Sequence, residues 1–408
     1  MGLYYYIGYR QRKTRSKGIF SIRISMKITD PSQYPIQSTN NFLSHCSVST
    51  LYQGAADAAS RFNQAHLEHG ISLFGSWGNP LHAFHRNFGA LLETSEDNIA
   101  FLQNTSEGIC QIANGYPFEP GDEIISYVHE YPANHYPWRL QEQRGVTLTL
   151  LSDVDPVGNF AATSPRGWSM DELEQRVSSR TRIIAISHVQ FTSAYPADLE
   201  QLGEFCASRG IDLIVDAAQS LGCLPIYPER WNIAAIAASG WKWLLGPIGS
   251  GVLYTSPALR EKVQITMAGA ELMKQNTEYL DHTWDPIESG ARFEYSTLAL
   301  SHAVGLDQCI QDIFLPLGIE RIAALVKARQ NQMLELIDRE KYTPLIWPAN
   351  RMSSFVSLAM KDQPDRAIVK LRRAGITLTS RGGYLRFAPH FYNSEEQVAE
   401  AVEVLNSI

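Results

Sequence analysis

Between residues 98 and 256, short apolar runs alternate with amphipathic stretches, and this alternation limits the folds open to the chain. The runs are nearly free of charge and rich in Ile, Leu, Val and Ala, which is typical of strands buried on both faces of a sheet. Strands separated by helices form βαβ units with parallel strands. We predict strands at 98–103, 121–127, 146–152, 182–190, 212–218, 233–239 and 249–256, and helices at 105–116, 131–145, 170–179 and 197–210.

This pattern predicts an α/β protein with a large, mostly parallel sheet. Beyond it, residues 260–300 show little periodicity, and a long helical region (about 298–340) precedes short strands and a final helix. We therefore expect a large domain at 46–297 and a smaller α+β domain at 298–408, preceded by an N-terminal segment at 28–45. Residues 1–27 are basic and lack acidic residues, so we expect a disordered extension, or sequence upstream of a start at Met26.

Composition excludes several classes of protein. The formal net charge of −7 argues against non-specific nucleic-acid binding, and no apolar run is long enough to span a membrane. The five cysteines are scattered without a CxxC pair, which favours a reduced, cytoplasmic protein. His82 and His85 have helical spacing but no third ligand nearby in sequence, so we expect no metal site.

Three polar features follow predicted strands, where an open α/β sheet places its ligand site. Asp216 ends an apolar strand, and Gln219 comes three residues later. Lys242 is the one charged residue in the stretch "IAAIAASGWKWLLGPIGSG". A buried carboxylate or ammonium is costly unless paired, and burial converts lysine toward the neutral amine that attacks aldehydes. Thr105 and Ser106, in "QNTSEGIC", open a helix whose backbone N–H groups and hydroxyls can hold an anion.

Each feature alone has a structural explanation. Lys242 could be a surface lysine with a buried stem, Asp216 a helix N-cap, and "NTSEG" a capping box. Together they fit pyridoxal 5′-phosphate, which presents an aldehyde, a ring nitrogen that must stay protonated, and a phosphate. On this interpretation Asp216 holds the ring nitrogen's proton, Gln219 reaches the ring oxygen, and Ser239 adds a phosphate donor.

The stretch "SHVQFTSAYPADLEQLGEFCASRGIDLIVDAAQSLGCLPI", followed by "ASGWKWLLGPIGSGVLY", resembles fold-type I pyridoxal-phosphate enzymes of the class V aminotransferase group. That group includes cysteine desulfurases, selenocysteine lyase, kynureninase and isopenicillin N epimerase-like proteins. The resemblance covers about residues 40–405 and includes Asp-x-x-Gln with a lysine about 26 residues beyond, as Asp216 and Lys242 stand here. It implies a fold-type I structure, in which a large α/β/α domain precedes a small C-terminal domain.

The resemblance also implies roles for single residues. Lys242 corresponds to the Schiff-base lysine, Asp216 to the partner of the pyridine nitrogen, and Arg386 to the arginine that binds the substrate's α-carboxylate. The implied cofactor-binding residues are Thr105, Ser106, Tyr131, Asp216, Gln219, Ser239, Trp241, Lys242 and Thr297.

Some of these roles have open alternatives. Tyr131 would stack on the cofactor or pack a loop. Thr297 would reach the phosphate of a neighbouring subunit, which implies a homodimer, or cap a helix. Arg386 would bind substrate or form a surface pair. His45 would touch substrate or cap a loop, and Arg381 would be a second anion contact or a turn residue.

The chain departs from cysteine desulfurases in three places. Desulfurases carry a reactive cysteine shortly before the arginine strand, but "TLTSRGGYLRF" has none. Tyr131 and Trp241 stand where desulfurases often have histidine, and Cys46 is expected to be a small buried residue. "RGGYLRFAPHFYN" looks most like the isopenicillin N epimerase-like and kynureninase-like members.

We expect an enzyme acting at the α-carbon of an amino acid, with Lys242 as general base. An aminotransferase is the preferred activity, because transamination needs no additional nucleophile or leaving group. A lyase catalysing β-elimination and an epimerase are the alternatives. A nucleotide-binding α/β protein is the non-enzymatic alternative, although "GPIGSG" lacks the GxxxxGK[ST] order.

Overall fold

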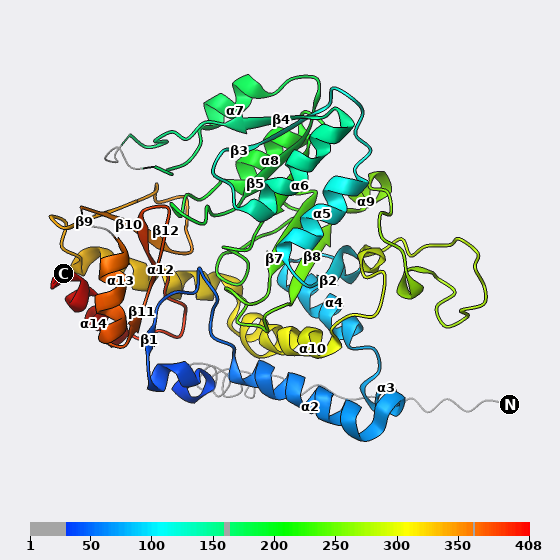
Figure 1. Cartoon of the computed structure of the whole chain (residues 1–408), viewed down its shortest axis with the longest axis horizontal. Helices are drawn as coiled ribbons and strands as arrows, with labels where there is room; N and C mark the ends of the chain where they lie inside the picture. Colours follow the sequence, from blue (N-terminus) through cyan, green and yellow to red (C-terminus); the bar gives the residue numbers. More distant parts are fainter. Residues whose placement is uncertain (1–29, 159–163, 362–363) are drawn as a thin grey trace, which may run out of the picture.

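The computed structural model describes residues 30–158, 164–361 and 364–408, so the predicted extension at 1–27 lies outside the described residues. A seven-stranded sheet forms the centre of the molecule (Figure 1), with strand order β2-β8-β7-β6-β5-β3-β4. Strand β8 is antiparallel to both neighbours and the other pairs are parallel. This confirms the predicted α/β class and mostly parallel sheet. The strands are β2 (Ile99–Leu102), β3 (Glu123–Tyr127), β4 (Thr147–Leu151), β5 (Thr181–Ser187), β6 (Asp212–Asp216), β7 (Ala235–Ser239) and β8 (Gly251–Thr255).

Both faces of the sheet are buried at the central strands, as the apolar strands predict, while the edge strand β4 is partly exposed. Alternate residues of β6 enter two different cores: Leu213 and Val215 join one, and Ile214 joins the other. Helix α5 (Thr105–Gly115) packs in the second core and α8 (Leu199–Ala207) in the first. Helix α5 approaches the sheet closely, because a Cβ at Gly108 would lie 2.8 Å from the side chain of Leu102. Shorter helices α6 (Tyr136–Leu140), α7 (Met170–Arg176) and α9 (Pro257–Lys262) complete this part.

The helix predicted at 131–145 was wrong in extent. Only α6 is α-helical there, flanked by 3₁₀ turns at Pro132–Asn134 and Gln141–Arg144. The 3₁₀ turn at Pro132–Asn134 and helix α6 each have a proline in their first turn. Proline lacks the N–H that a continuous helix needs, so the segment is broken into short pieces.

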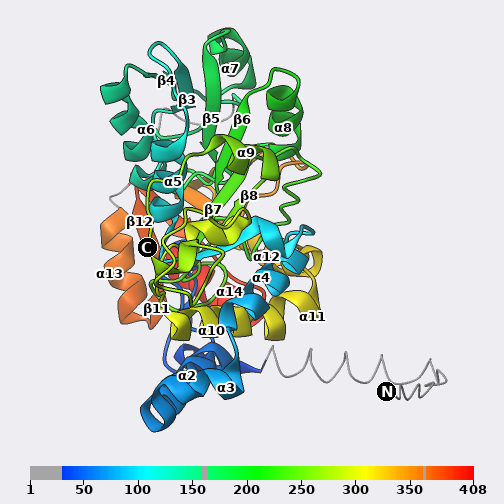
Figure 2. The same cartoon turned by 90° about the vertical axis from the view of Figure 1, so that its right-hand side faces the viewer.

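Helices α2 (Gln53–His69), α3 (Leu73–Trp77) and α4 (Pro80–Leu91) precede the sheet. Figures 1 and 2 show α2 and α3 at the end of the molecule opposite α7. Helix α10 (Leu300–Cys309) packs against α2 and α4. Helix α2 was not predicted from the sequence, because its buried face consists of only Ala55, Ala58 and Phe62.

The C-terminal part contains a four-stranded antiparallel sheet with order β12-β13-β10-β9. Strand β1 (Asn41–Phe42) of the N-terminal segment pairs in parallel with β11 (Ile376–Thr377), and Ser44 bridges Ala388. The predicted domain bounds stay a prediction. The remaining elements are α11 (Leu315–Leu317), α12 (Ile319–Leu336), β9 (Tyr342–Pro344), β10 (Val356–Met360), α13 (Pro364–Arg373), β12 (Thr379–Arg381), β13 (Tyr384–Phe387) and α14 (Glu395–Asn406). No helix of the described ranges is both long and apolar enough to cross a membrane.

Candidate active site

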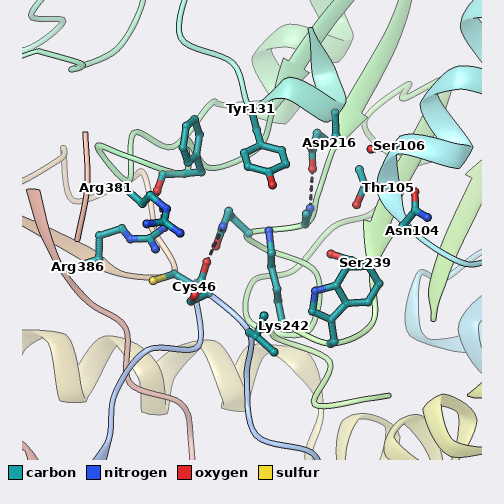
Figure 3. A pocket seen from close by; sticks show the side chains of 17 residues that line it. Cys46, Asn104, Thr105, Ser106, Tyr131, Asp216, Ser239, Lys242, Arg381 and Arg386 are labelled. Atoms are coloured by element: carbon teal, nitrogen blue, oxygen red, sulfur yellow. Dashed lines mark hydrogen bonds between the residues drawn. The ribbon is translucent and has the colours of Figure 1, made fainter. Parts of the chain in front are cut away.

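A cavity of about 270 Å³ lies beside the carboxyl ends of β6 and β7. Figure 3 shows Thr105 and Ser106 on one side of it, Arg381 and Arg386 on the other, and Lys242 between them. Its walls come from segments far apart in the chain, including the N-terminal segment and the C-terminal sheet. The lining residues are Cys46, Ser47, Val48, Asn104, Thr105, Ser106, Tyr131, Ala133, Phe191, Asp216, Ala218, Gln219, Ser239, Trp241, Lys242, Arg381 and Arg386.

Asp216 is the last residue of β6, and its carboxylate is buried. Oδ1 accepts a hydrogen bond from the backbone N–H of Ala218 at 2.9 Å (Figure 3). Burial raises the pKa of Asp216, while the positive charge of Lys242 and the Ala218 N–H lower it. The carboxylate therefore has a hydrogen-bond donor in its own turn and the positive charge of Lys242 in the same cavity, which offset part of the cost of its burial.

Lys242 lies in the turn after β7 and is partly exposed because it faces the cavity. Burial lowers the pKa of its ammonium, Asp216 raises it, and Arg386 lowers it. Its Nζ lies 5.5 Å from the centre of the Tyr131 ring. The lowered pKa increases the fraction of neutral amine, which is the nucleophilic and basic form.

The start of helix α5 borders the opposite side of the cavity. Its N-cap, Asn104, accepts a hydrogen bond from the backbone N–H of Glu107 at 2.9 Å. The first backbone N–H groups of a helix have no acceptor within the helix, and they carry partial positive charge. Thr105 Oγ1 is buried and has no hydrogen-bond partner among the described residues. This unpartnered hydroxyl, with Ser106 beside it, fits an anion such as phosphate.

Gln219 links the cavity to two other segments. Its Nε2 donates to the carbonyl of Cys46 at 2.9 Å, and its Oε1 accepts from the indole of Trp243 at 3.3 Å. One N–H of the amide remains for a ligand. Ser239 ends β7, and Trp241 follows Gly240; both line the cavity.

Arg386 extends from β13 into the cavity and is buried. One guanidinium N–H donates to the carbonyl of Phe191 at 2.9 Å and another to the hydroxyl of Thr379 at 3.0 Å. Its Nε has no partner within the described chain. A buried guanidinium without a carboxylate partner is suited to bind an anionic ligand. Arg381 lines the same end and is exposed.

The structure brings together all but one of the predicted cofactor-binding residues. Thr297 is exposed and is not among the residues that line this cavity. His45 does not line it either: its ring is buried, with one nitrogen 2.8 Å from the Ala388 carbonyl and the other 2.6 Å from the Tyr392 hydroxyl. Cys46 is buried, as expected, yet it borders the cavity.

Sequence reasoning missed several lining residues. Phe191 carries no local signal, because it reaches the cavity only through tertiary packing, and no role was assigned to Ser47 or Val48, which follow His45 and Cys46 in the sequence. Asn104 could have been found as the residue before the predicted helix, since asparagine is a favoured N-cap.

Glu130 was not singled out from the sequence, and it does not line the cavity. It is buried next to Tyr131 in the chain and accepts hydrogen bonds from the backbone N–H and hydroxyl of Ser187 and from the amide of Gln190. Burial raises its pKa to about 7, and the bonds from Ser187 and Gln190 oppose that shift.

The profile of the aminotransferase class-V family matches residues 76–396. The chain therefore belongs to the aminotransferase class-V family, which confirms the resemblance drawn from the sequence. Among curated relatives, a "Probable cysteine desulfurase" of Methanothermobacter thermautotrophicus is 24% identical over 78% of this chain and 80% of the relative. An "Uncharacterized aminotransferase YcbU" of Bacillus subtilis is 23% identical over 91% of this chain and 96% of the relative.

Solved structures show the same fold. The cystine C-S lyase C-DES, in complex with cysteine persulfide, has a TM-score of 0.83 at 19% identity, covering 92% of this chain and 100% of that chain. An apo cysteine desulfurase from Thermococcus onnurineus has a TM-score of 0.78 at 22% identity, covering 92% of this chain and 96% of that chain. Family membership argues against the nucleotide-binding alternative.

The buried histidines predict how stability depends on pH. Burial lowers the pKa of His188 to about 3, below its ordinary value near 6.5, so the folded state binds fewer protons than the unfolded state. The stability from neutral His188 is present above about pH 6.5 and is lost as the pH falls toward 3, at about 1.4 kcal/mol per pH unit. The change would be measured by urea unfolding at several pH values.

Glu130 has the opposite sign, because its raised pKa makes stability fall as the pH rises from about 4.5 to 7. The free energy of unfolding of the wild type is therefore compared with that of His188→Gln. This variant keeps Glu130 but has no titratable side chain at position 188. The difference between their unfolding free energies should shrink as the medium is acidified. A constant difference from pH 7.5 to 5 would contradict a neutral, buried His188.

Proposed function

We propose that the protein is a pyridoxal-phosphate-dependent enzyme acting on an α-amino acid, and that its reaction is a lyase reaction at a carbon–sulfur bond. The observation that carries the proposal is the single cavity holding Lys242, Asp216 and Arg386. The unpartnered hydroxyl of Thr105 at the start of α5 supports a phosphate on one side, and the buried Arg386 supports a carboxylate on the other.

When bound, pyridoxal phosphate supplies an electron sink that stabilises negative charge at the α-carbon. The chain's own residues would hold and orient the reactants. Asp216 would keep a proton on the ring nitrogen, Gln219 would use its remaining N–H for the ring oxygen, and Ser239 and Trp241 would border the phosphate and ring. Tyr131, whose ring faces Lys242, would cover one face of the cofactor.

Lys242 would hold the cofactor covalently and then move the α-proton as its neutral amine. Burial favours the neutral amine, and Asp216 opposes this shift. Arg386 would bind the substrate carboxylate, since its guanidinium presents donors in a planar fork. Arg381 at the same end would add positive charge for an anionic group on the substrate.

The reaction preferred from sequence was transamination, and the comparisons favour the lyase alternative instead. Relatives named as probable cysteine desulfurases and a structural neighbour named as a cystine C-S lyase support a sulfur-containing amino acid as substrate. Removal of the α-proton would be followed by cleavage of the Cβ–S bond, releasing the sulfur fragment, with pyruvate and ammonia formed after hydrolysis.

Aminotransferase activity remains the second candidate. The segment 377–387, which includes β12 and β13, carries no cysteine to accept sulfur, which argues against sulfur transfer to the protein there and is compatible with both transamination and elimination. A relative named as an aminotransferase supports this second candidate.

We further propose that the enzyme is a homodimer. Thr297 is exposed and does not line the cavity of its own chain, so it is free to serve the cavity of a second copy.

Lys242→Ala should abolish covalent attachment of the cofactor, because the amine that attacks the aldehyde is lost. Wild-type protein mixed with pyridoxal phosphate should gain a visible absorption band, and borohydride should fix the label on the peptide containing Lys242. The control is Lys274→Ala, which removes an exposed lysine paired with Asp285 and Glu288 and should label normally. A label mapping to any other lysine would contradict the assignment.

The lyase reaction predicts sulfur release from L-cysteine or L-cystine, together with pyruvate. Transamination would leave the Cβ–S bond intact and would consume an acceptor keto acid. Products would be measured by a sulfide assay and lactate dehydrogenase coupling, with Lys242→Ala as the blank. Keto-acid-dependent turnover without sulfur release would replace the lyase proposal with the aminotransferase.

A shared active site predicts complementation between two inactive variants. Thr297→Glu should repel the phosphate of the neighbouring site, and Lys242→Ala should disable its own site. Co-expressed chains would form hybrid dimers in which one site has both native residues, so activity should partly return.

Light scattering of the wild-type protein should give twice the mass of one chain. A monomeric mass, or a failure of complementation, would argue against the shared site.

A further inference from the structure

The turn that carries Lys242 has little regular structure, so its backbone depends on contacts with other segments. Four consecutive carbonyls in this turn accept hydrogen bonds from different places. The carbonyl of Gly240 accepts from Gly246, and that of Lys242 accepts from Leu245, both within the turn. The carbonyl of Trp241 accepts from the backbone N–H of Ser49, which precedes α2, at 2.9 Å.

The carbonyl of Trp243 accepts from the side chain of His390, at 2.9 Å from Nε2. Trp243 and His390 are both fully buried. A buried carbonyl needs a donor, and here that donor is an imidazole from the segment after β13. Helix or strand hydrogen bonds do not satisfy this carbonyl, so the imidazole sets the position of the residue that follows Lys242.

The hydrogen bonds of His390 define its tautomer. A carbonyl can only accept, so Nε2 carries the proton donated to Trp243. Nδ1 accepts from the backbone N–H of Phe391 at 2.9 Å, so it carries none. Burial lowers the pKa of His390 to about 4, which agrees with a neutral ring. The backbone N–H of His390 donates to Asn393 at 2.8 Å, which holds the ring's own segment in place.

His390 stands four residues after Arg386 in the same segment. The bond to Trp243 therefore joins the segment that carries the proposed carboxylate contact to the turn that carries the proposed cofactor lysine. An active site needs such groups held at a fixed separation, since small displacements lower rates strongly.

We propose that His390 is a positioning residue for Lys242, and that its Nε2–H bond to the Trp243 carbonyl fixes the turn of Lys242 relative to the strand of Arg386. The inference rests on the proposed function, because it assigns His390 a role toward the lysine that would hold pyridoxal phosphate. His390 does not line the cavity, so it acts through the backbone of Trp243.

The test compares His390→Leu with Tyr342→Phe. Tyr342 is buried in the C-terminal part, and its hydroxyl donates to the carbonyl of Leu405 at 2.8 Å. Both variants lose a buried side-chain hydrogen bond to a carbonyl, and His390→Leu also loses the bond from the Phe391 N–H, but only His390 is bonded beside Lys242. His390→Gln is the conservative variant, since its amide can still donate to Trp243.

The readout is the rate at which cofactor-free protein gains the visible band after pyridoxal phosphate is added, measured as a function of pH. His390→Leu should slow attachment about tenfold, which is the effect of losing about one hydrogen bond. A looser turn hydrates the Lys242 amine and raises its pKa, so the rate profile should shift to higher pH. Asp216, Arg386 and Cys46, the ionisable groups acting on that amine, are unchanged in every variant.

Tyr342→Phe should leave both rate and profile close to wild type, and His390→Gln should recover part of the rate. Equal rates and profiles for wild type and His390→Leu would overturn this inference alone. Equal slowing by Tyr342→Phe would also overturn it, because the effect would then be general destabilisation. A wild-type chain that forms no band would overturn the proposed function and this inference with it. If His390→Leu does not fold, His390→Gln is compared with Tyr342→Phe. Slower attachment in His390→Gln than in both wild type and Tyr342→Phe supports the inference, and a rate equal to that of wild type or of Tyr342→Phe overturns it.

Discussion

The rest of the site depends on two opposite charges that line one cavity. Asp216 ends β6 and Lys242 follows the neighbouring strand β7, and desolvation disfavours the charged form of each. Each charge favours the ionised form of the other, which offsets part of that cost. The surrounding polar contacts are therefore closely constrained, since a displaced partner would leave a buried charge uncompensated. This explains why so many segments meet around the turn of Lys242.

Those segments come from the whole chain. The residues just before α2 contribute the Ser49 N–H to Trp241 and the Cys46 carbonyl to Gln219, and the region after β13 contributes His390 to Trp243. Because β1 pairs with β11, the N-terminal segment and the C-terminal part are held to each other as well as to the cavity. Local opening of any one of them would loosen the lysine turn.

Two observations bear on the chemistry. Relatives are named as probable cysteine desulfurases, which act on a sulfur-containing amino acid, and this chain has no cysteine at 377–387. A reaction that transfers sulfur to the protein needs a thiol near the substrate, and among the lining residues only Cys46, which is buried, carries one. Elimination needs only a base and an electron sink. In the proposed reaction Lys242 would provide the base and a bound pyridoxal ring the sink, so elimination is compatible with the residues that line the cavity.

The sequence by itself determined the strands of the central sheet and the side chains that follow them. Apolar runs are local signals, and parallel strands bring their carboxyl ends to one edge, so Asp216, Lys242 and the start of α5 could be expected to meet. Only the tertiary structure decided that Phe191 lines the cavity and that His45 and His390 are buried in hydrogen-bonded positions. Those outcomes depend on contacts between residues distant in the chain, and no local pattern encodes them.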